Sequence, residues 1–200
     1  MNVIIFDTEF LSLSKKQSDY NSLIKYKNRM FPEIFQFSFL EVKLFADTKI
    51  KKKYNYYLKT KKEIPLRLKK LTNLTKNKIL KAISFKEFAS VLSAYLISKK
   101  KNILICNGSD IELLKLNLNK NKIILNINVK YVNLRKISQH IDYKPMNTYE
   151  LKKNISSKLK VHDAINDCKI IFYYLGKIKR RMGLKKFNRL INNFVQIKKI

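Results

Sequence analysis

The stretch Val3-Ile4-Ile5-Phe6-Asp7-Thr8-Glu9-Phe10 begins with four apolar residues and then turns acidic. Such an apolar run, rich in β-branched side chains, is typical of a strand buried on both faces, as in the middle of an α/β sheet. Because side chains alternate along a strand, Asp7 and Glu9 fall on the same side of it. Two neighbouring carboxylates repel each other and resist ionising together unless a cation lies between them. The alternative is a strand that ends at Ile5, with both acids solvated in a loop.

A second acid follows another apolar run. The segment 102–106 predicts a buried strand, and Asn107-Gly108-Ser109 predicts a turn that delivers Asp110 to the start of a helix. An ordinary helix N-cap at Ser109 or Asp110 is the alternative explanation of this segment.

The third acidic segment is His162-Asp163-Ala164-Ile165-Asn166-Asp167. His162 and Asp167 are five residues apart, so they share a face only if His162 lies on a loop or in the first helical turn. The alternative is that Asp163 marks a helix N-terminus and that His162 is an ordinary surface residue.

The rest of the pattern predicts one α/β domain with further strands at 33–45, 51–59 and 131–134, the second and third strands being antiparallel. Helices are expected from Pro65 onward, one of them opened by a capping box from Ser84 to Glu87. The segment 15–27 is expected to be a loop or insertion. The remainder, 135–200, has a helical pattern with a break near 143–145, and 183–200 is expected to form an amphipathic helix.

Composition narrows the function classes. Lys and Arg number 44 against 14 Asp and Glu, so the net charge of +30 favours a polyanionic partner: nucleic acid first, an anionic membrane second. Most of the excess is Lys, which A+T-rich codon usage also raises. Apolar residues at 46% exclude a disordered chain, and two Cys exclude a disulfide scaffold. Neither a signal peptide nor a membrane helix is evident, so we expect a cytoplasmic protein or, in a cell with a nucleus, a nuclear one.

Taken in order, the Asp-x-Glu of the first strand, the later Asp110 and the pair His162 and Asp167 resemble the motifs of the DEDDh 3′–5′ exonucleases of the ribonuclease H-like superfamily, over about 1–175. Phe31-Pro32-Glu33-Ile34, Leu71-Thr72-Asn73-Leu74-Thr75 and His162-Asp163-Ala164 are similar to further family segments. The segment 106–110 lacks the His of the proofreading subunits and is more similar to the KapD-like and small-RNA-trimming branch.

The resemblance implies a mixed five-stranded sheet flanked by helices, in a single exonuclease domain over 1–200 with a helical extension at about 176–200. It also implies two Mg²⁺ or Mn²⁺ ions, with His162 as the general base. The implied metal ligands are Asp7, Glu9, Asp110 and Asp167. Contacts to the terminal nucleotide are expected from Thr8, Phe10 and Leu11.

The expected reaction is release of nucleoside 5′-monophosphates from the 3′ ends of single-stranded RNA or DNA, with RNA somewhat favoured. The alternatives are a proofreading exonuclease of a DNA polymerase, a catalytically weak basic nucleic-acid-binding protein, and a protein held at a membrane surface by its lysines. The lysine clusters at 51–53, 99–101 and 179–181 are candidates to follow a phosphate backbone, or are solvated faces. The sequence does not identify any protein partner.

Overall fold

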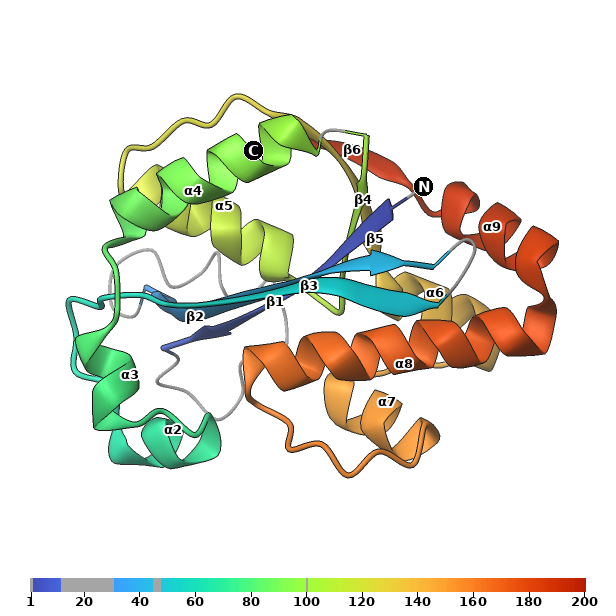
Figure 1. Cartoon of the computed structure of the whole chain (residues 1–200), viewed down its shortest axis with the longest axis horizontal. Coiled ribbons are helices and arrows are strands. Elements are labelled where there is room, and N and C mark those ends of the chain that lie inside the picture. The colour runs from blue at the N-terminus through green and yellow to red at the C-terminus, as the bar shows by residue number, and fades with distance from the viewer. Residues whose placement is uncertain (1, 12–30, 45–47, 100) are drawn as a thin grey trace.

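Strand β1 (Asn2–Phe10) lies inside a six-stranded sheet whose strand order is β3-β2-β1-β4-β5-β6. The computed structural model describes residues 2–11, 31–44, 48–99 and 101–200 (Figure 1). β1 pairs antiparallel with β2 and parallel with β4, so the sheet is mixed. The other strands are β2 (Ile34–Lys43), β3 (Lys49–Tyr57), β4 (Ile103–Cys106), β5 (Asn128–Asn133) and β6 (Gln196–Lys199).

Helices cover both faces of the sheet (Figure 1). On one face lie α4 (Phe85–Ser98) and α5 (Asp110–Lys120). The other face is covered by α6 (Leu134–Asp142), α7 (Thr148–Asn154), α8 (Ala164–Met182) and α9 (Leu184–Asn193). Alternation along β1 explains the two layers, because Val3 and Ile5 pack in the α8 layer whereas Ile4 and Phe6 pack in the α4–α5 layer. The same alternation turns Asp7 and Glu9 toward the α8 layer.

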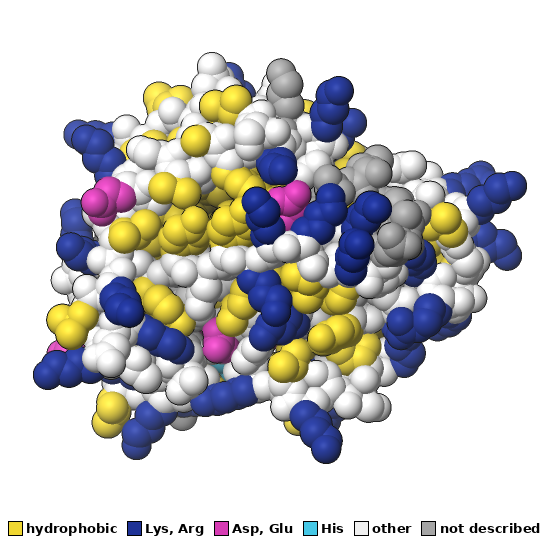
Figure 2. Space-filling model, viewed as in Figure 1, with side chains coloured by type: hydrophobic (Ala, Val, Ile, Leu, Met, Phe, Trp, Pro, Cys, Tyr) yellow, Lys and Arg dark blue, Asp and Glu magenta, His cyan; other side chains and the backbone are white. Residues whose placement is uncertain are grey.

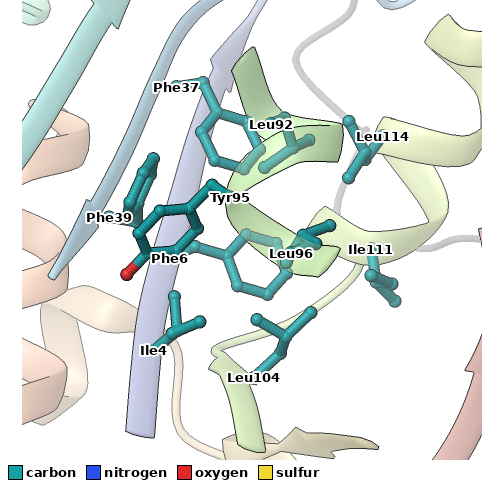
Figure 3. Close-up of a pocket in the computed structure, with 10 residues that line it drawn as sticks. All are labelled: Ile4, Phe6, Phe37, Phe39, Leu92, Tyr95, Leu96, Leu104, Ile111 and Leu114. Atoms are coloured by element: carbon teal, nitrogen blue, oxygen red, sulfur yellow. The ribbon is translucent and has the colours of Figure 1, made fainter. Parts of the chain in front are cut away.

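A small apolar cavity of about 10 Å³ lies between β1, β2, β4 and the helices α4 and α5 (Figure 3). Hydrophobic and aromatic side chains line it, among them Phe6, Phe37 and Leu114. A water molecule there would find no polar partner. This cavity is therefore a packing gap in the core, on the face of the sheet away from Asp7 and Glu9.

Two short helices, α2 (Leu66–Leu71) and α3 (Lys76–Leu80), follow β3. Near them a third apolar cluster joins the end of β1 to this part of the chain, and it consists of Leu11, Phe35, Ile64 and Leu74. Among the described residues, no helix is both long enough and apolar enough to cross a membrane.

Several expectations from the sequence are confirmed. β2 and β3 are antiparallel, and the capping box at α4 is present, with the Ser84 hydroxyl and the Glu87 carboxylate each accepting the other residue's backbone N–H. α5 begins at Asp110, directly after the turn that follows β4. The expected loop at 15–27 lies outside the described residues.

The expectation of five strands is wrong, because a sixth strand pairs antiparallel with β5. The stretch 183–200 is not one helix: α9 ends at Asn193, and β6 follows it at the edge of the sheet. The expected boundary near 175 also falls inside α8, which continues to Met182. Only a few residues follow the part of the sequence that has a helical pattern. A strand of four residues there is too short to show a pattern of its own.

Candidate active site

Asp7 and Glu9 occupy the end of β1, where the strand leaves the centre of the sheet. Asp7 is buried and Glu9 is half-buried. Glu9 lies opposite Gln36 of β2, and the pairing shifts by one residue directly after Glu9. Both acids therefore belong to β1 and lie near its C-terminal end, and the alternative of a strand ending at Ile5 is wrong.

Asp110 joins them from the first turn of α5. Gly108, with φ of 137°, makes the turn from β4 into this helix, a conformation that a side chain would strain. The Asp110 carboxylate accepts two hydrogen bonds from Thr8, at 3.0 Å from the backbone N–H and at 2.7 Å from the hydroxyl. Because Thr8 lies between Asp7 and Glu9, these bonds fix Asp110 beside the end of β1.

His162 and Asp167 complete the group at the start of α8. His162 lies before the helix, as sharing a site with Asp167 requires, and its φ of 62° places it in the left-handed region. Its backbone N–H donates to Asp167 Oδ2 at 3.2 Å. One ligand atom from each of Glu9, His162 and Asp167 lies within 4.8 Å of the other two.

The acids shift one another's protonation. Burial, followed by the charges of Asp110, Asp167, Glu9 and Asp163, raises the pKa of Asp7 well above its usual value. Burial is also the first cause that raises the pKa of Glu9 and of Asp110, and it raises the pKa of Asp167 to about 7. The group therefore resists carrying its full negative charge at neutral pH without a compensating cation.

These residues fit a divalent cation. Asp167 Oδ1 is buried and has no hydrogen-bond partner among the residues that the structure describes. A buried carboxylate oxygen without a donor is costly unless something positive meets it. Hard oxygen ligands are those that Mg²⁺ and Mn²⁺ prefer.

The three residues expected to touch a nucleotide lie in different surroundings. Thr8 is buried and is held by Asp110, whereas Phe10 is half-buried against the α4–α5 layer. Leu11 is buried in the third apolar cluster. A cleft of about 380 Å³ borders that cluster, with Tyr57 and several lysines on its walls.

Two further polar residues lie at the site and were not expected there from the sequence, although Asp163 was considered as the marker of a helix N-terminus. Asp163, the N-cap residue of α8, is buried, and its charge contributes to the raised pKa of Asp7. Gln36 is fully buried and donates a hydrogen bond to Asp163. The pairing of β1 with β2 brings Gln36 to this place, and no local sequence pattern signals it.

Positive charge is spread widely around this site. Lys and Arg side chains are scattered over the face shown in Figure 2, with few acidic side chains among them. The lysines at 51–53 are exposed on β3, the edge strand of the sheet. Edge strands commonly carry lysines that discourage pairing with other chains, so their position alone does not indicate a ligand.

No protein-family model matches the sequence, and no curated protein is significantly similar to it. Solved structures are similar in fold. The nuclease domain of 3′hExo, described as a DEDDh family member bound to rAMP, has a TM-score of 0.71 at 14% identity, covering 100% of this chain and 97% of that one. S. pombe Pop2p, in a form with Mg²⁺ and Mn²⁺ bound, has a TM-score of 0.69 at 15% identity, covering 90% and 83%.

Cell-death related nuclease 4 has a TM-score of 0.69 at 18% identity over 91% of this chain, and the match spans 64% of that protein. For E. coli Exonuclease I in complex with a dA16 oligonucleotide, the match spans 42% of that protein, at 14% identity and a TM-score of 0.67. The chain therefore spans less than two thirds of these two nucleases. At such identities the likeness establishes the fold alone: this chain shares the ribonuclease H-like fold of these structures.

Proposed function

We propose that this protein is a divalent-cation-dependent 3′–5′ exonuclease that releases nucleoside 5′-monophosphates from single-stranded nucleic acid. The observation that carries the proposal is the convergence of four acids and His162 at one end of the sheet, from β1, α5 and the start of α8. The fold, shared with 3′-exonucleases, supports it. On this proposal residues 1–200 form a single exonuclease domain.

Asp7, Glu9, Asp110 and Asp167 would hold the cations, two Mg²⁺ or Mn²⁺ ions. When bound, such ions activate a water molecule and stabilise the charge that develops on the phosphate and on the departing 3′ oxygen. Thr8 contributes by orienting Asp110 through its two hydrogen bonds. In this role Thr8 acts through a metal ligand rather than through the nucleotide.

His162 is the proposed general base. Burial lowers the pKa of His162 below its usual 6.5, so its imidazole is neutral at pH 7 and can accept a proton. One of its ring nitrogens lies within 4.8 Å of carboxylate oxygens of Glu9 and Asp167, which supports a role for His162 in accepting the proton of the attacking water.

The substrate is proposed to be a single strand with a free 3′ end, RNA somewhat favoured. The 3′hExo domain bound to rAMP and the Exonuclease I complex with dA16 support both polymers as candidates. The middle segment Cys106–Asp110 supports the KapD-like and small-RNA-trimming branch over the proofreading subunits. Phe10 and Leu11 are proposed to border the site of the terminal nucleotide, next to the 380 Å³ cleft.

Matched RNA and DNA oligonucleotides, each labelled in turn at the 5′ and the 3′ end, test the proposal. With Mg²⁺ or Mn²⁺, the 3′-labelled strand should release labelled mononucleotide at once, while the 5′-labelled strand shortens stepwise. Replacing His162 by Ala should lower kcat about 10²- to 10⁴-fold. His140, the only other histidine, is exposed near Phe194, so His140→Ala is the matched control.

The net charge of +30 favours a second candidate, a basic nucleic-acid-binding protein with weak or no catalysis. The same experiment separates the two. Binding of the oligonucleotide without cation-stimulated release of mononucleotide would reject the exonuclease and leave the binding protein.

A further inference from the structure

We propose that Gln36 of β2 is a positioning residue that tethers Asp163 to the sheet and so fixes the turn that presents His162 to the acids. This inference rests on the exonuclease function proposed above, because it assigns His162 a proton-accepting role. The proposal stands on the hydrogen bonds of one fully buried amide.

The amide of Gln36 bridges two elements. Its Nε2 donates to Asp163 Oδ1 at 2.9 Å and to Asn55 Oδ1 of β3 at 3.0 Å. The opposite orientation of the amide would direct its oxygen at two acceptors, a carboxylate and the Asn55 oxygen, so the donating orientation is the one that pairs with both. In this orientation Gln36 Oε1 is buried and has no hydrogen-bond partner among the residues that the structure describes. Ser38 also donates to Asn55 Oδ1, at 2.7 Å, which anchors the bridge in the sheet.

Asp163 has its side chain free for this tether. Although Asp163 is the N-cap residue of α8, its carboxylate makes no capping hydrogen bond to the first turn of the helix. Its backbone carbonyl starts the helix instead, accepting from the N–H of Asn166 and of Asp167. The side chain therefore joins the helix start to β2 rather than to its own helix.

The turn needs such an anchor. His162 lies in the left-handed region, which a non-glycine residue occupies only when its surroundings fix it. It follows the stretch 155–161, which is neither helix nor strand. A second hydrogen bond at the turn runs from the His162 N–H to Asp167 Oδ2, a candidate cation ligand. The tether through Gln36 involves no proposed ligand, so it holds the turn in the cation-free and the loaded protein alike.

The choice of an amide rather than an acid also follows from the position. Gln36 lies opposite Glu9 in the sheet, on the same face. A carboxylate at residue 36 would add another negative charge beside the acids and would have no proton to donate to Asp163. Gln36→Glu should therefore break the tether although it keeps the shape of the side chain.

Kinetics of variants give the first test. Gln36→Glu and Gln36→Leu should lower kcat about 10- to 100-fold, with KM for an oligonucleotide changed less than twofold, because the base is misplaced while the substrate surface is intact. Ser38→Ala is the matched control, since it disturbs the same buried network without touching Asp163.

A reversed pair gives the second test. In Asp163→Asn the new amide oxygen still accepts from Gln36, so kcat should stay within about threefold of the unmodified protein. In the double variant Gln36→Glu with Asp163→Asn, the amide at position 163 donates to the carboxylate at position 36. The kcat of the double variant should therefore return to within about threefold of that of the unmodified protein. If Asp163→Asn and the double variant lose as much activity as Gln36→Glu, the charge of Asp163 matters rather than its tether, and the proposal is overturned.

A readout without activity completes the test. The chain has only two histidines, so its imidazole NMR spectrum contains signals of His162 and His140 alone. In cation-free protein, Gln36→Leu should shift or broaden the His162 signal and leave His140 unchanged. Unchanged signals with unchanged kcat in an active enzyme would reject the tether. An inactive unmodified protein would instead reject the exonuclease function.

Discussion

The hydroxyl of Thr8 offers a sharp test of how a single residue supports the site. It donates to Asp110 Oδ1 at 2.7 Å from a buried position. Thr8→Val keeps the shape and removes the donor, so it should raise the pKa of Asp110 further and weaken cation binding. We expect the Mg²⁺ concentration for half-maximal activity to rise about 10-fold or more. Measuring kcat against Mg²⁺ concentration checks this.

Thr8→Ser keeps the hydroxyl and is the control for Thr8→Val. A Mg²⁺ dependence of Thr8→Val equal to that of Thr8→Ser would show that the hydrogen bond does not support the cation site. A raised KM for the oligonucleotide with unchanged Mg²⁺ dependence would instead support the contact between Thr8 and the nucleotide that is expected from the sequence.

Individual site residues could be predicted from the sequence where both the residue type and its spacing pointed to the same role. Asp7 and Glu9 are predictable because the period of a strand fixes their common side, and His162 because five residues of spacing require it to precede the helix. Gln36 and Asp163 are not predictable as partners. Their contact depends on the register of β2 against β1 and on the approach of α8, and neither leaves a local pattern.

Helix α4 gives a prediction that separates stability from function. Ser84 caps this helix by accepting from the Glu87 N–H at 3.1 Å. Ser84→Ala should lower the free energy of unfolding by about 1 kcal/mol. Because α4 packs on the face of the sheet away from the acids, kcat should be unchanged. Urea unfolding and a standard nuclease assay measure both quantities, and a fall in kcat would mean that α4 is coupled to the site.

Elements were predictable in proportion to their length and periodicity. The antiparallel β2 and β3 follow from patterns of nine or more residues, and the capping box follows from the specific spacing of Ser84 and Glu87. β6 has only four residues, three of them polar, and it gains its stability from pairing with β5 and from the contact of Ile200 with Ile127. Such a strand forms because it pairs with a strand far away in the sequence, so its own residues do not predict it.

The charge of the whole molecule predicts how binding responds to salt. Lys59, Lys61 and Lys62 line the 380 Å³ cleft that borders the cluster containing Leu11. If they meet phosphates, replacing all three by Gln should reduce the slope of log K against log salt by about 2 for a single strand. Titrations of an oligonucleotide at several salt concentrations measure this slope.

The matched control for the cleft lysines is a triple replacement of Lys136, Lys185 and Lys186 by Gln, which removes the same charge from exposed positions on α6 and α9. The control should leave the slope nearly unchanged. Equal losses from both triples would mean that the +30 charge acts as a diffuse field rather than through this cleft.

The acids also predict how stability changes with pH. The pKa of Asp167 rises from 3.8 to about 7 in the folded, cation-free protein. A raised pKa means that the folded state holds its proton longer than the unfolded state, so the contribution of Asp167 to stability is complete below pH 3.8 and is lost as the pH rises toward 7. In EDTA, the unfolding free energy of the unmodified protein relative to Asp167→Asn should therefore fall across this range, by up to about 1.4 kcal/mol per pH unit.

Adding Mg²⁺ at pH 7.5 should reverse that loss in the unmodified protein but not in Asp167→Asn, because a bound cation stabilises only the folded state that can hold it. Urea unfolding at four pH values, with EDTA and with Mg²⁺, gives both differences. Glu63→Gln, which removes an exposed acid that pairs with Lys69, is the control and should follow the unmodified protein. A flat difference between the unmodified protein and Asp167→Asn, together with no effect of Mg²⁺, would mean that these carboxylates are accommodated without a cation, and the metal-dependent chemistry would lose its basis.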